Sequence, residues 1–487
     1  MLQIKDSQKL FEFKTYFESP TQAFSNLMSI FVVFSSTWIV KGIFNLKTKG
    51  YSYSYLLQTL ILMPFLGAKN IHGLFKTHYH DFYQGCKDSL YDTMHNPYIN
   101  WRLLLLNFAK QFIRKVKPYN SGNTLTYFIA DDTDLEKRSP LFEGISRVFN
   151  HVVHKHILAY KLLALGYSDG KSFIPLDFSL HNEKGKKKNY GLTGKQRKGQ
   201  YKKERTQTSH GAKRKKEVRT EKGKNLLKMV KRSVKHGIIA DYLLTDSWFL
   251  SENMICEIRK IKNGAIHILS MCKMDKRKYT FENGCYNAKE LLLLKKQNKK
   301  NITRSKKHKV YYIEIIVDYK GFKLKLFFTR LSKHSKWRLL ATTNTSLSFT
   351  QAFDMYSNRW AIEVFFKEGK QLLGLGKNQS RDFDAQVAST SISFIQYIIL
   401  ALYKRADKYE TIGGIFEACK TEISEQVFAD RIKVLLQDLI ETIVLMLNLS
   451  FEIEETISTI IHNIDIAGKI KLIYSTPTYK GGTKKAA

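Results

Sequence analysis

Acidic residues stand at the ends of two apolar stretches whose composition is typical of β-strands. Asp131 and Asp132 lie at the end of the first, TLTYFIADDTD, and Asp246 lies at the end of the second, GIIADYLLTDSWF. Acids at the carboxyl ends of sheet strands lie where α/β proteins place their ligands. For either strand alone, a turn or helix-cap residue is the better explanation. A third group of residues, further along the chain, makes a chemical role the stronger interpretation.

This third group occupies one face of a predicted helix near residue 360. At 100° per residue, Tyr356, Arg359, Glu363 and Lys370 fall within a wedge of about 60° beside the apolar stripe of the helix. A surface ladder of ion pairs is one explanation, because Arg359 and Glu363 are four residues apart. A carboxylate flanked by cations also suits phosphodiester chemistry, in which the acid holds a metal ion and the cations hold phosphate oxygens.

The string YSNRWAIEVFFKEGK resembles the Y-R-E-K motif of insertion-sequence transposases of the DDE class, in the IS-four family. The motif positions are occupied by Tyr356, Arg359, Glu363 and Lys370. Trp360 follows the arginine, as in several members. FIADDTD is similar to the first-aspartate strand of the family, with Asp132 at the Asp-Thr step, and LLTDSWF is similar to the second-aspartate strand. The resemblance covers residues 124–400.

The resemblance implies a ribonuclease-H-like core in which Asp132, Asp246 and Glu363 are catalytic and hold two Mg²⁺ ions, with Mn²⁺ able to substitute. Asp131 stays the alternative to Asp132, because a slip of one residue turns a strand's side chains to the other face. The residues expected to bind DNA are Tyr356, Arg359, Lys370 and Trp360.

The activity implied by the resemblance is cleavage of DNA at the ends of an insertion sequence and joining of those ends to target DNA. The expected partners are double-stranded DNA, as terminal inverted repeats and as target, and a second copy of the chain in a synaptic complex. The motif does not decide whether a DNA hairpin forms on the way. Two alternatives stay open: a metal-dependent nuclease on the same core without joining, and a basic DNA-binding protein whose acids are structural.

The order of predicted elements divides the chain into four regions. Residues 1–120 show apolar residues at helical spacing, which predicts a helical N-terminal domain. We expect this domain to bind DNA ends. Residues 124–271 and 348–405 alternate strands and helices, which predicts an α/β core with a mixed sheet flanked by helices. Residues 272–347 alternate like antiparallel strands and predict a β-rich insertion with a hairpin at Tyr319-Lys320-Gly321. Residues 406–487 predict a helical region with a basic tail.

The charge of the chain points to a polyanionic partner. Eighty Lys and Arg against 43 Asp and Glu give a formal charge of +37, which opposes compaction unless an anion compensates it. A segment from Lys184 to Lys235, which overlaps a predicted basic loop at 182–221, holds 21 of the cations and three acids. We expect this segment to be poorly packed without DNA and to order along its phosphates.

Other features favour a reducing, aqueous compartment. Five scattered cysteines without C-x-x-C pairs argue against a disulfide framework or a zinc knuckle. The uncharged stretches Ser19–Val40 and Tyr51–Ala68 reach spanning length only by including polar residues, which favours buried core helices over membrane spans. The N-terminus lacks the apolar run of a signal peptide. We therefore expect no membrane partner and a cytoplasmic, nucleoid-associated location in a prokaryote.

Two further groups carry weaker signals. His151, His154 and His156 lack a fourth ligand nearby, so a structural or DNA-facing role is favoured over a metal site. Trp337, in the predicted insertion, is a candidate for stacking on an extruded base. A place in the core or in a hairpin is the stronger expectation for this residue.

Overall fold

The computed structural model describes residues 50–68, 70–76, 85–122, 124–150, 152–406 and 410–423. Its centre is a twelve-stranded mixed sheet in the order β2-β3-β1-β5-β6-β12-β11-β10-β7-β8, with β4 paired to β3 and β9 paired to β10. The strands are β1 Tyr127–Glu136, β2 Ser146–Asn150, β3 Lys155–Ser168, β4 Phe173–His181, β5 Tyr242–Thr245, β6 His267–Cys272, β7 Lys278–Phe281, β8 Gly284–Asn287, β9 Thr303–Arg304, β10 Tyr311–Tyr319, β11 Phe322–Arg330 and β12 Arg338–Thr342.

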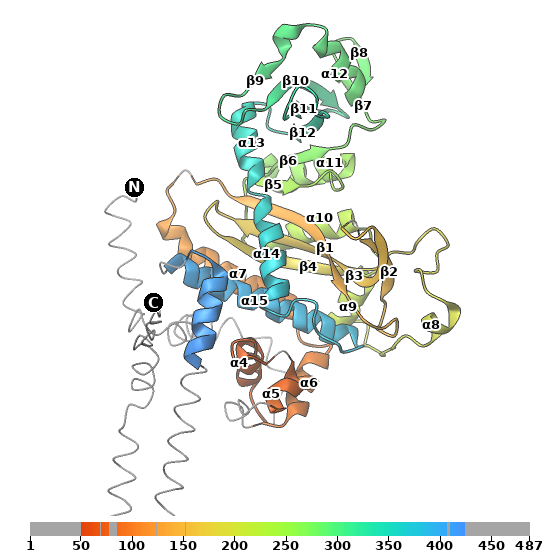
Figure 1. Ribbon diagram of the computed structural model, residues 1–487, viewed down its shortest axis with the longest axis vertical. Helices are drawn as coiled ribbons and strands as arrows, with labels where there is room; N and C mark the ends of the chain where they lie inside the picture. The colour runs from red at the N-terminus through yellow and green to blue at the C-terminus, as the bar shows by residue number, and fades with distance from the viewer. Residues whose placement is uncertain are drawn as a thin grey trace, which may run out of the picture.

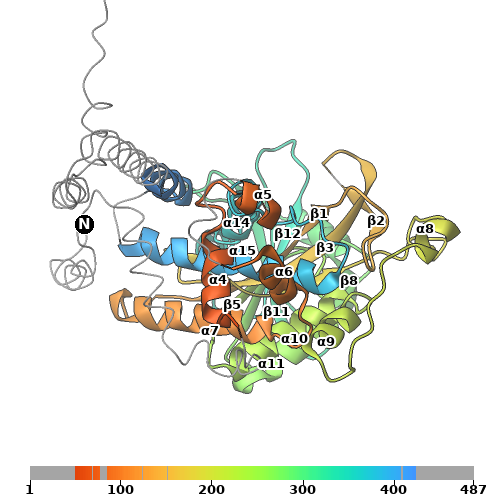
Figure 2. The same cartoon turned by 90° about the horizontal axis from the view of Figure 1, so that it is seen from below.

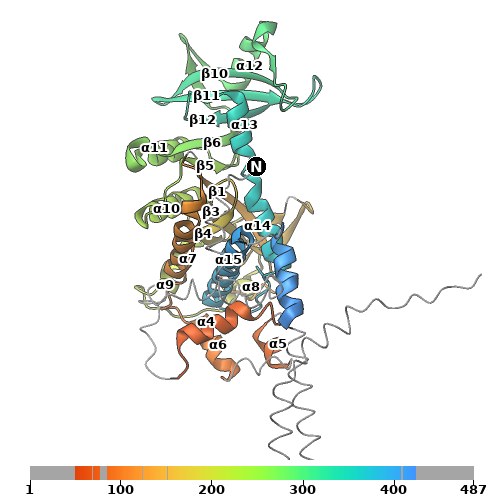
Figure 3. The same ribbon diagram turned by 90° about the vertical axis from the view of Figure 1, so that its left-hand side faces the viewer.

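Helices lie on both faces of this sheet, which confirms the predicted fold class. Figure 3 shows α10 and α11 on one side and α13 and α14 on the other. The helices are α4 Tyr53–Leu62, α5 Ile71–Lys76, α6 Lys87–His95, α7 Trp101–Val116, α8 Gly194–Lys198, α9 His210–Glu217, α10 Lys222–Lys235, α11 Glu252–Lys260, α12 Ala288–Lys296, α13 Phe349–Ser357, α14 Trp360–Gln371 and α15 Phe383–Ala406. Residues 412–423 are also helical.

The two strands that carry the predicted aspartates, β1 and β5, lie next to each other in the sheet. Strands β1 and β5 are parallel neighbours, and β5 and β6 are parallel as well. Strand β3 ends at Ser168 and β4 begins at Phe173, and Gly170 in the turn between them adopts a positive φ of 79°. Every residue of β4 is buried, because helices α7, α14 and α15 pack on this strand.

The region predicted as an insertion continues the central sheet. Strand β12 pairs antiparallel with β6, and β11 and β10 follow outward as an antiparallel hairpin. The predicted turn lies between β10 and β11, where Lys320 and Gly321 both have positive φ. The sheet therefore runs without interruption from the core into the insertion (Figure 1).

Helix α15 is the central helix of the fold. It packs against α7, α6 and α4 from the N-terminal region and against β4 of the sheet. It has the length and apolar composition of a membrane span, but 94% of its most apolar window is buried inside the molecule. Of the two uncharged stretches, Ser19–Val40 lies outside the described residues. Tyr51–Ala68 contains α4, whose residues Leu56, Leu57 and Leu60 are buried.

Candidate active site

Strands β1 and β5 bring two acids side by side. Asp131 lies in the middle of β1, contrary to its predicted place at the end of a strand, whereas Asp246 directly follows the end of β5. Ile129 pairs with Leu244 in the parallel register, so two residues further on Asp131 lies opposite Asp246. Side chains directly opposite in neighbouring strands point to the same face of a sheet, whereas the next residue points to the other face. The register therefore places Asp131 on the same face as Asp246 and Asp132 on the other face, although the Asp132 carboxylate is still near enough to raise the pKa of Asp246.

Glu363 joins these acids through an arginine. The Arg359 guanidinium donates from Nη1 to Asp131 Oδ2 at 2.6 Å and from Nη2 to Glu363 Oε1. Burial opposes the charge of Arg359, but Tyr356, Asp131 and Glu363 together raise its pKa, so it stays a cation. We call Asp131, Asp246, Glu363 and Arg359 the acid site. The structure thus brings together Glu363, Arg359 and the alternative aspartate, Asp131.

The helix that carries the motif is divided, contrary to the prediction of one continuous helix. Helix α13 ends at Ser357 and α14 begins at Trp360, with Arg359 at the N-cap position. The Asn358 side chain donates to the carbonyl of Met355, and the Arg359 N–H bonds to Tyr356 O, which tightens the chain at the junction. Tyr356 and Glu363 consequently belong to different helices, and the junction aims Arg359 at β1.

Two further motif residues contact the same strands. Tyr356 donates from its hydroxyl to the carbonyl of Thr245 at 3.1 Å, and burial raises its pKa to about 12. Lys370 Nζ donates to Thr133 Oγ1 at 2.7 Å, and burial lowers the pKa of this amine. Trp360 is 63% exposed. The motif therefore places one hydroxyl, two cations and an exposed aromatic ring next to β1 and β5.

The acid site holds more negative charge than its own cation balances. Burial raises the pKa of Asp131 to about 6, and the nearby carboxylates of Asp246 and Asp132 add to this effect, although Arg359 opposes it. Burial also raises the pKa of Asp246, and the carboxylate of Asp132 contributes. Crowded, partly desolvated carboxylates of this kind gain from a further cation.

The predicted catalytic residue Asp132 has a different partner. Its Oδ2 lies 2.6 Å from Lys222 Nζ, at the start of α10. Next to this pair stands Trp248, which is 73% exposed and lies with its ring 4.6 Å from Lys273 Nζ. Sequence reasoning misses Lys222 because nothing local links it to β1. Trp248 stands in the string LLTDSWF, but its position there does not by itself identify it as functional.

The donor set of the acid site fits Mg²⁺, which prefers hard carboxylate oxygens. Asp131, Asp246 and Glu363 supply such oxygens from two strands and one helix. As the side chains stand, no three His, Cys, Asp or Glu residues in the described ranges form a metal-ligand cluster. The reason is visible in the contacts, because the Arg359 guanidinium lies between Asp131 and Glu363. Metal binding at this site therefore requires Arg359 to give up those two bonds.

The weaker candidates show no sign of a second centre. His156 packs edge-on against Phe149, and His154 has a positive φ of 50° at the β2–β3 turn. His151 lies outside the described residues. Trp337 is partly buried against the core, with the Arg330 guanidinium 4.5 Å from its ring.

The basic segment is mostly folded, contrary to expectation. It contains α8, α9 and α10, and several of its cations form buried ion pairs. The largest group, which we call the inner cluster, comprises Lys203, Arg205, Glu143, Asp382 and Asp384. Arg214 and Arg232 of the segment bind Asp177 together with Arg102 of α7. Burial opposes the charge of this carboxyl, but the three arginines lower its pKa to about 2. The segment is ordered because acids from other parts of the chain pair with its cations. The sequence of the segment alone does not reveal these pairs.

One part of the segment remains exposed. Residues 183–202, which we call the α8 arm, project from the body in both Figure 1 and Figure 2. Lys186, Lys187 and Lys188 are exposed on this arm. The arm therefore carries exposed cations away from the core, as expected for contact with a phosphate backbone.

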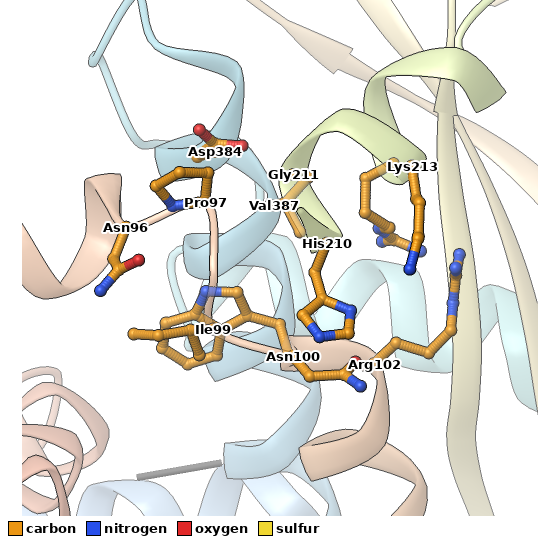
Figure 4. A pocket seen from close by; sticks show the side chains of 12 residues that line it. Asn96, Pro97, Ile99, Asn100, Arg102, His210, Gly211, Lys213, Asp384 and Val387 are labelled. Carbon is orange, nitrogen blue, oxygen red and sulfur yellow. The ribbon is translucent and has the colours of Figure 1, made fainter. Parts of the chain in front are cut away.

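A separate cavity of about 160 Å³ lies between α7, α9 and α15. Figure 4 shows Asn100, Arg102, His210 and Lys213 around it. Its lining includes none of the predicted catalytic residues. The acid site is therefore distinct from this cavity.

Comparison with protein families agrees with this geometry. Residues 67–261 match a family model described as DDE superfamily endonuclease, and residues 177–399 match one described as transposase DDE domain. The first match contains Asp131 and Asp246, and the second contains Asp246 and Glu363. These two matches support a protein of the DDE transposase type, and with it DNA cleavage of the kind that transposases perform. No curated protein matches the chain.

Proposed function

We propose that this chain cuts DNA at the ends of its insertion sequence and joins them to target DNA, with Asp131, Asp246 and Glu363 as the catalytic carboxylates. The observation that carries the proposal is the Arg359 bridge between Asp131 and Glu363, beside Asp246 on the same sheet face. Asp131 takes the place of Asp132, the sequence-based choice, because Asp132 points to the other face and binds Lys222.

Asp131, Asp246 and Glu363 would hold two Mg²⁺ ions, or Mn²⁺ in their place. When bound, such a pair lowers the pKa of the attacking water and stabilises both the attacking and the leaving oxygen of an in-line displacement. The protein's own part is to fix three carboxylates on rigid strands and a helix. Arg359 keeps them together when their charge is otherwise uncompensated.

The cations of the motif are suited to hold phosphate oxygens. Arg359, once released from the carboxylates, offers a planar fork that matches phosphate. Lys370 contacts β1 further along the strand and would bind a neighbouring phosphate. Tyr356 and the exposed Trp360 would lie on either side of the bound DNA strand. These residues position the cut end and do not read its sequence.

Double-stranded DNA, as terminal inverted repeats and as target, is the proposed partner. The large positive charge supports it, as does the α8 arm. A dimer in a synaptic complex and a cytoplasmic, nucleoid-associated location belong to the same proposal. Cleavage without joining is the second candidate, because one matching family is described as an endonuclease. Joined products distinguish the two.

The experiment is a gel assay with radiolabelled element-end DNA in Mg²⁺, scored for nicked, hairpin and joined products. Glu363→Gln keeps size and hydrogen-bonding capacity but removes a negative ligand, so nicking should disappear while DNA affinity stays the same or rises. Glu257→Gln, on α11 and paired with Lys231 and Lys260, is the matched control and should nick at the parental rate. Parental nicking by Glu363→Gln would refute the catalytic assignment.

A further inference from the structure

The insertion carries a second run of cations, within residues 296–309. No acid stands between Glu290 and Glu314 in the sequence. Six cations of the run are exposed, and within the described ranges they form no ion pair with a carboxylate. We call them the insertion patch, and its members are Lys296, Lys299, Lys300, Arg304, Lys306 and Lys309. Their charge is therefore available to an external anion.

The strand directions place this run at the edge of the sheet that carries the acid site. Strands β5 and β6 are parallel, and both end at the edge where Asp246 lies. The next strands alternate in direction, so β12 begins, β11 ends and β10 begins at this same edge. Arg304 of β9 pairs with Tyr311, the first residue of β10. The turn of residues 305–310, which joins β9 to β10, therefore projects from the edge that carries the acid site.

Contacts with α13 hold this turn beside the motif helices. Lys307 Nζ lies 2.6 Å from Asp354 Oδ2, and His308 Nε2 lies 3.2 Å from Asp354 Oδ1. The centre of the His308 ring lies 4.7 Å from that of Phe353. Asp354 stands two residues before Tyr356, whose hydroxyl binds the last carbonyl of β5. Because α13 leads from β9 and β10 to α14 (Figure 1), it fixes the turn relative to the acid site.

The spacing of the strands gives the distance from the acid site to the insertion patch. In the order of the sheet, four spacings separate β5 from β10, and six separate β1 from β9. At about 4.8 Å for each spacing, the patch lies roughly 20–30 Å from the acid site along the sheet. Successive base pairs of a duplex are about 3.4 Å apart, so this distance corresponds to about six to nine base pairs.

We propose that the insertion patch binds the phosphate backbone of the duplex that is cut at the acid site, about six to nine base pairs from the cut. Exposed lysines neutralise phosphates whatever the base sequence, so the patch positions the duplex and does not read its bases. The proposal rests on the proposed function in taking the acid site as the place where DNA is cut.

The test measures binding without chemistry, by fluorescence anisotropy of labelled element-end duplexes in EDTA at several salt concentrations, using the full chain. One duplex reaches about 15 base pairs beyond the cut on both sides, and two others are shortened to about four base pairs on one side or the other. On the long duplex, Lys300→Ala/Lys306→Ala should lower the magnitude of the slope of log affinity against log salt by about 1.8, because each lost phosphate contact contributes about 0.9. On one of the shortened duplexes, the variant and the parent should have the same slope.

Lys320→Ala/Lys323→Ala is the matched control. It removes the same number of exposed cations from the same insertion, but at the opposite end of the β10–β11 hairpin, so the slope should not change on any duplex. A parental slope for Lys300→Ala/Lys306→Ala on the long duplex, or an equal fall in the control, would overturn the proposal. A fall that persists on both shortened duplexes would overturn it as well, because the patch would then bind a separate DNA segment. Any of these results with a parent chain that nicks would refute the insertion patch alone, and the expected slopes in a chain that does not nick would refute the catalytic proposal alone.

Discussion

The inner cluster and the acid site both consist of carboxylates held by an arginine, yet they differ in access to water. In the inner cluster, the side chains of Arg205, Glu143, Asp382 and Asp384 are at most 9% exposed. In the acid site, Asp131 is 19% exposed and Glu363 is 32% exposed. The first is closed by its own cations, whereas the second is open and can exchange its cation.

The two sites also differ in how their charge is balanced. Arg205 and Lys203 together bind the inner acids, and Lys215 adds a third cation near Glu143. In the acid site a single guanidinium serves two acids, and burial raises the pKa of Asp131 and Asp246, as it also does for Asp384 in the inner cluster. The difference lies in the number of cations. A buried ion network with as many cations as acids is structural, whereas one with fewer cations is the better place for metal chemistry.

The largest effect on stability is expected on replacing Arg205, and a much smaller one on replacing Arg359. Arg205→Ala leaves three buried carboxylates without their main partner and should lower the free energy of unfolding by about 3–5 kcal/mol. Arg359→Ala leaves acids that water can reach and should cost about 1 kcal/mol. Urea denaturation followed by tryptophan fluorescence measures both. Equal decreases would show that the acid site is as structural as the inner cluster.

Lys137 extends the comparison of the two sites, because it is a buried amine that forms no ion pair within the described residues. Lys137 donates to the carbonyls of Gly376 and Asn378, and burial lowers its pKa to about 7. The unfolded chain, with a lysine pKa of about 10.4, then binds more protons than the folded chain above pH 7. Stability should therefore rise between pH 7 and 9, by up to roughly 1.4 kcal/mol per pH unit.

Lys137→Met removes this contribution, so the difference in urea midpoint between variant and parent should change with pH in that window. A constant difference would mean that Lys137 stays charged in the folded chain.

Replacing the exposed lysines of the α8 arm should have the smallest effect on stability but a clear effect on DNA binding. Replacing Lys186, Lys187 and Lys188 by Ala should leave the urea midpoint unchanged, since these side chains are exposed. The slope of log affinity for DNA against log salt should fall in magnitude by about 0.9 for each phosphate that the arm no longer neutralises. Deleting the whole segment from Lys184 to Lys235 would instead remove α10 and part of the inner cluster. An unchanged slope in the triple variant would exclude the arm from DNA binding.

The sequence predicted the sheet and its acids because those signals are local. Strand β1, the hairpin of β10 and β11 and the motif of α14 each show their pattern within a short window. The choice between Asp131 and Asp132 depends on strand register, which pairing with β5 determines. The inner cluster joins Glu143, Arg205 and Asp384, which are far apart in sequence, so composition alone suggested unpaired cations. The break before α14 combines local hydrogen bonds from Asn358 to the end of α13 with the tertiary contact between Arg359 and Asp131.

The most direct measurement compares Asp131→Asn with Asp132→Asn in single-turnover nicking of element-end DNA in Mg²⁺. Both changes keep shape and remove one charge, so they differ only in which face of β1 loses its carboxylate. We expect Asp131→Asn to slow nicking by about a hundredfold or more, which corresponds to about 2.7 kcal/mol. Asp132→Asn, which loses only its pair with Lys222, should stay within about tenfold of the parent, a change of at most about 1.4 kcal/mol. The reverse order, with Asp132→Asn inactive and Asp131→Asn active, would contradict the acid site.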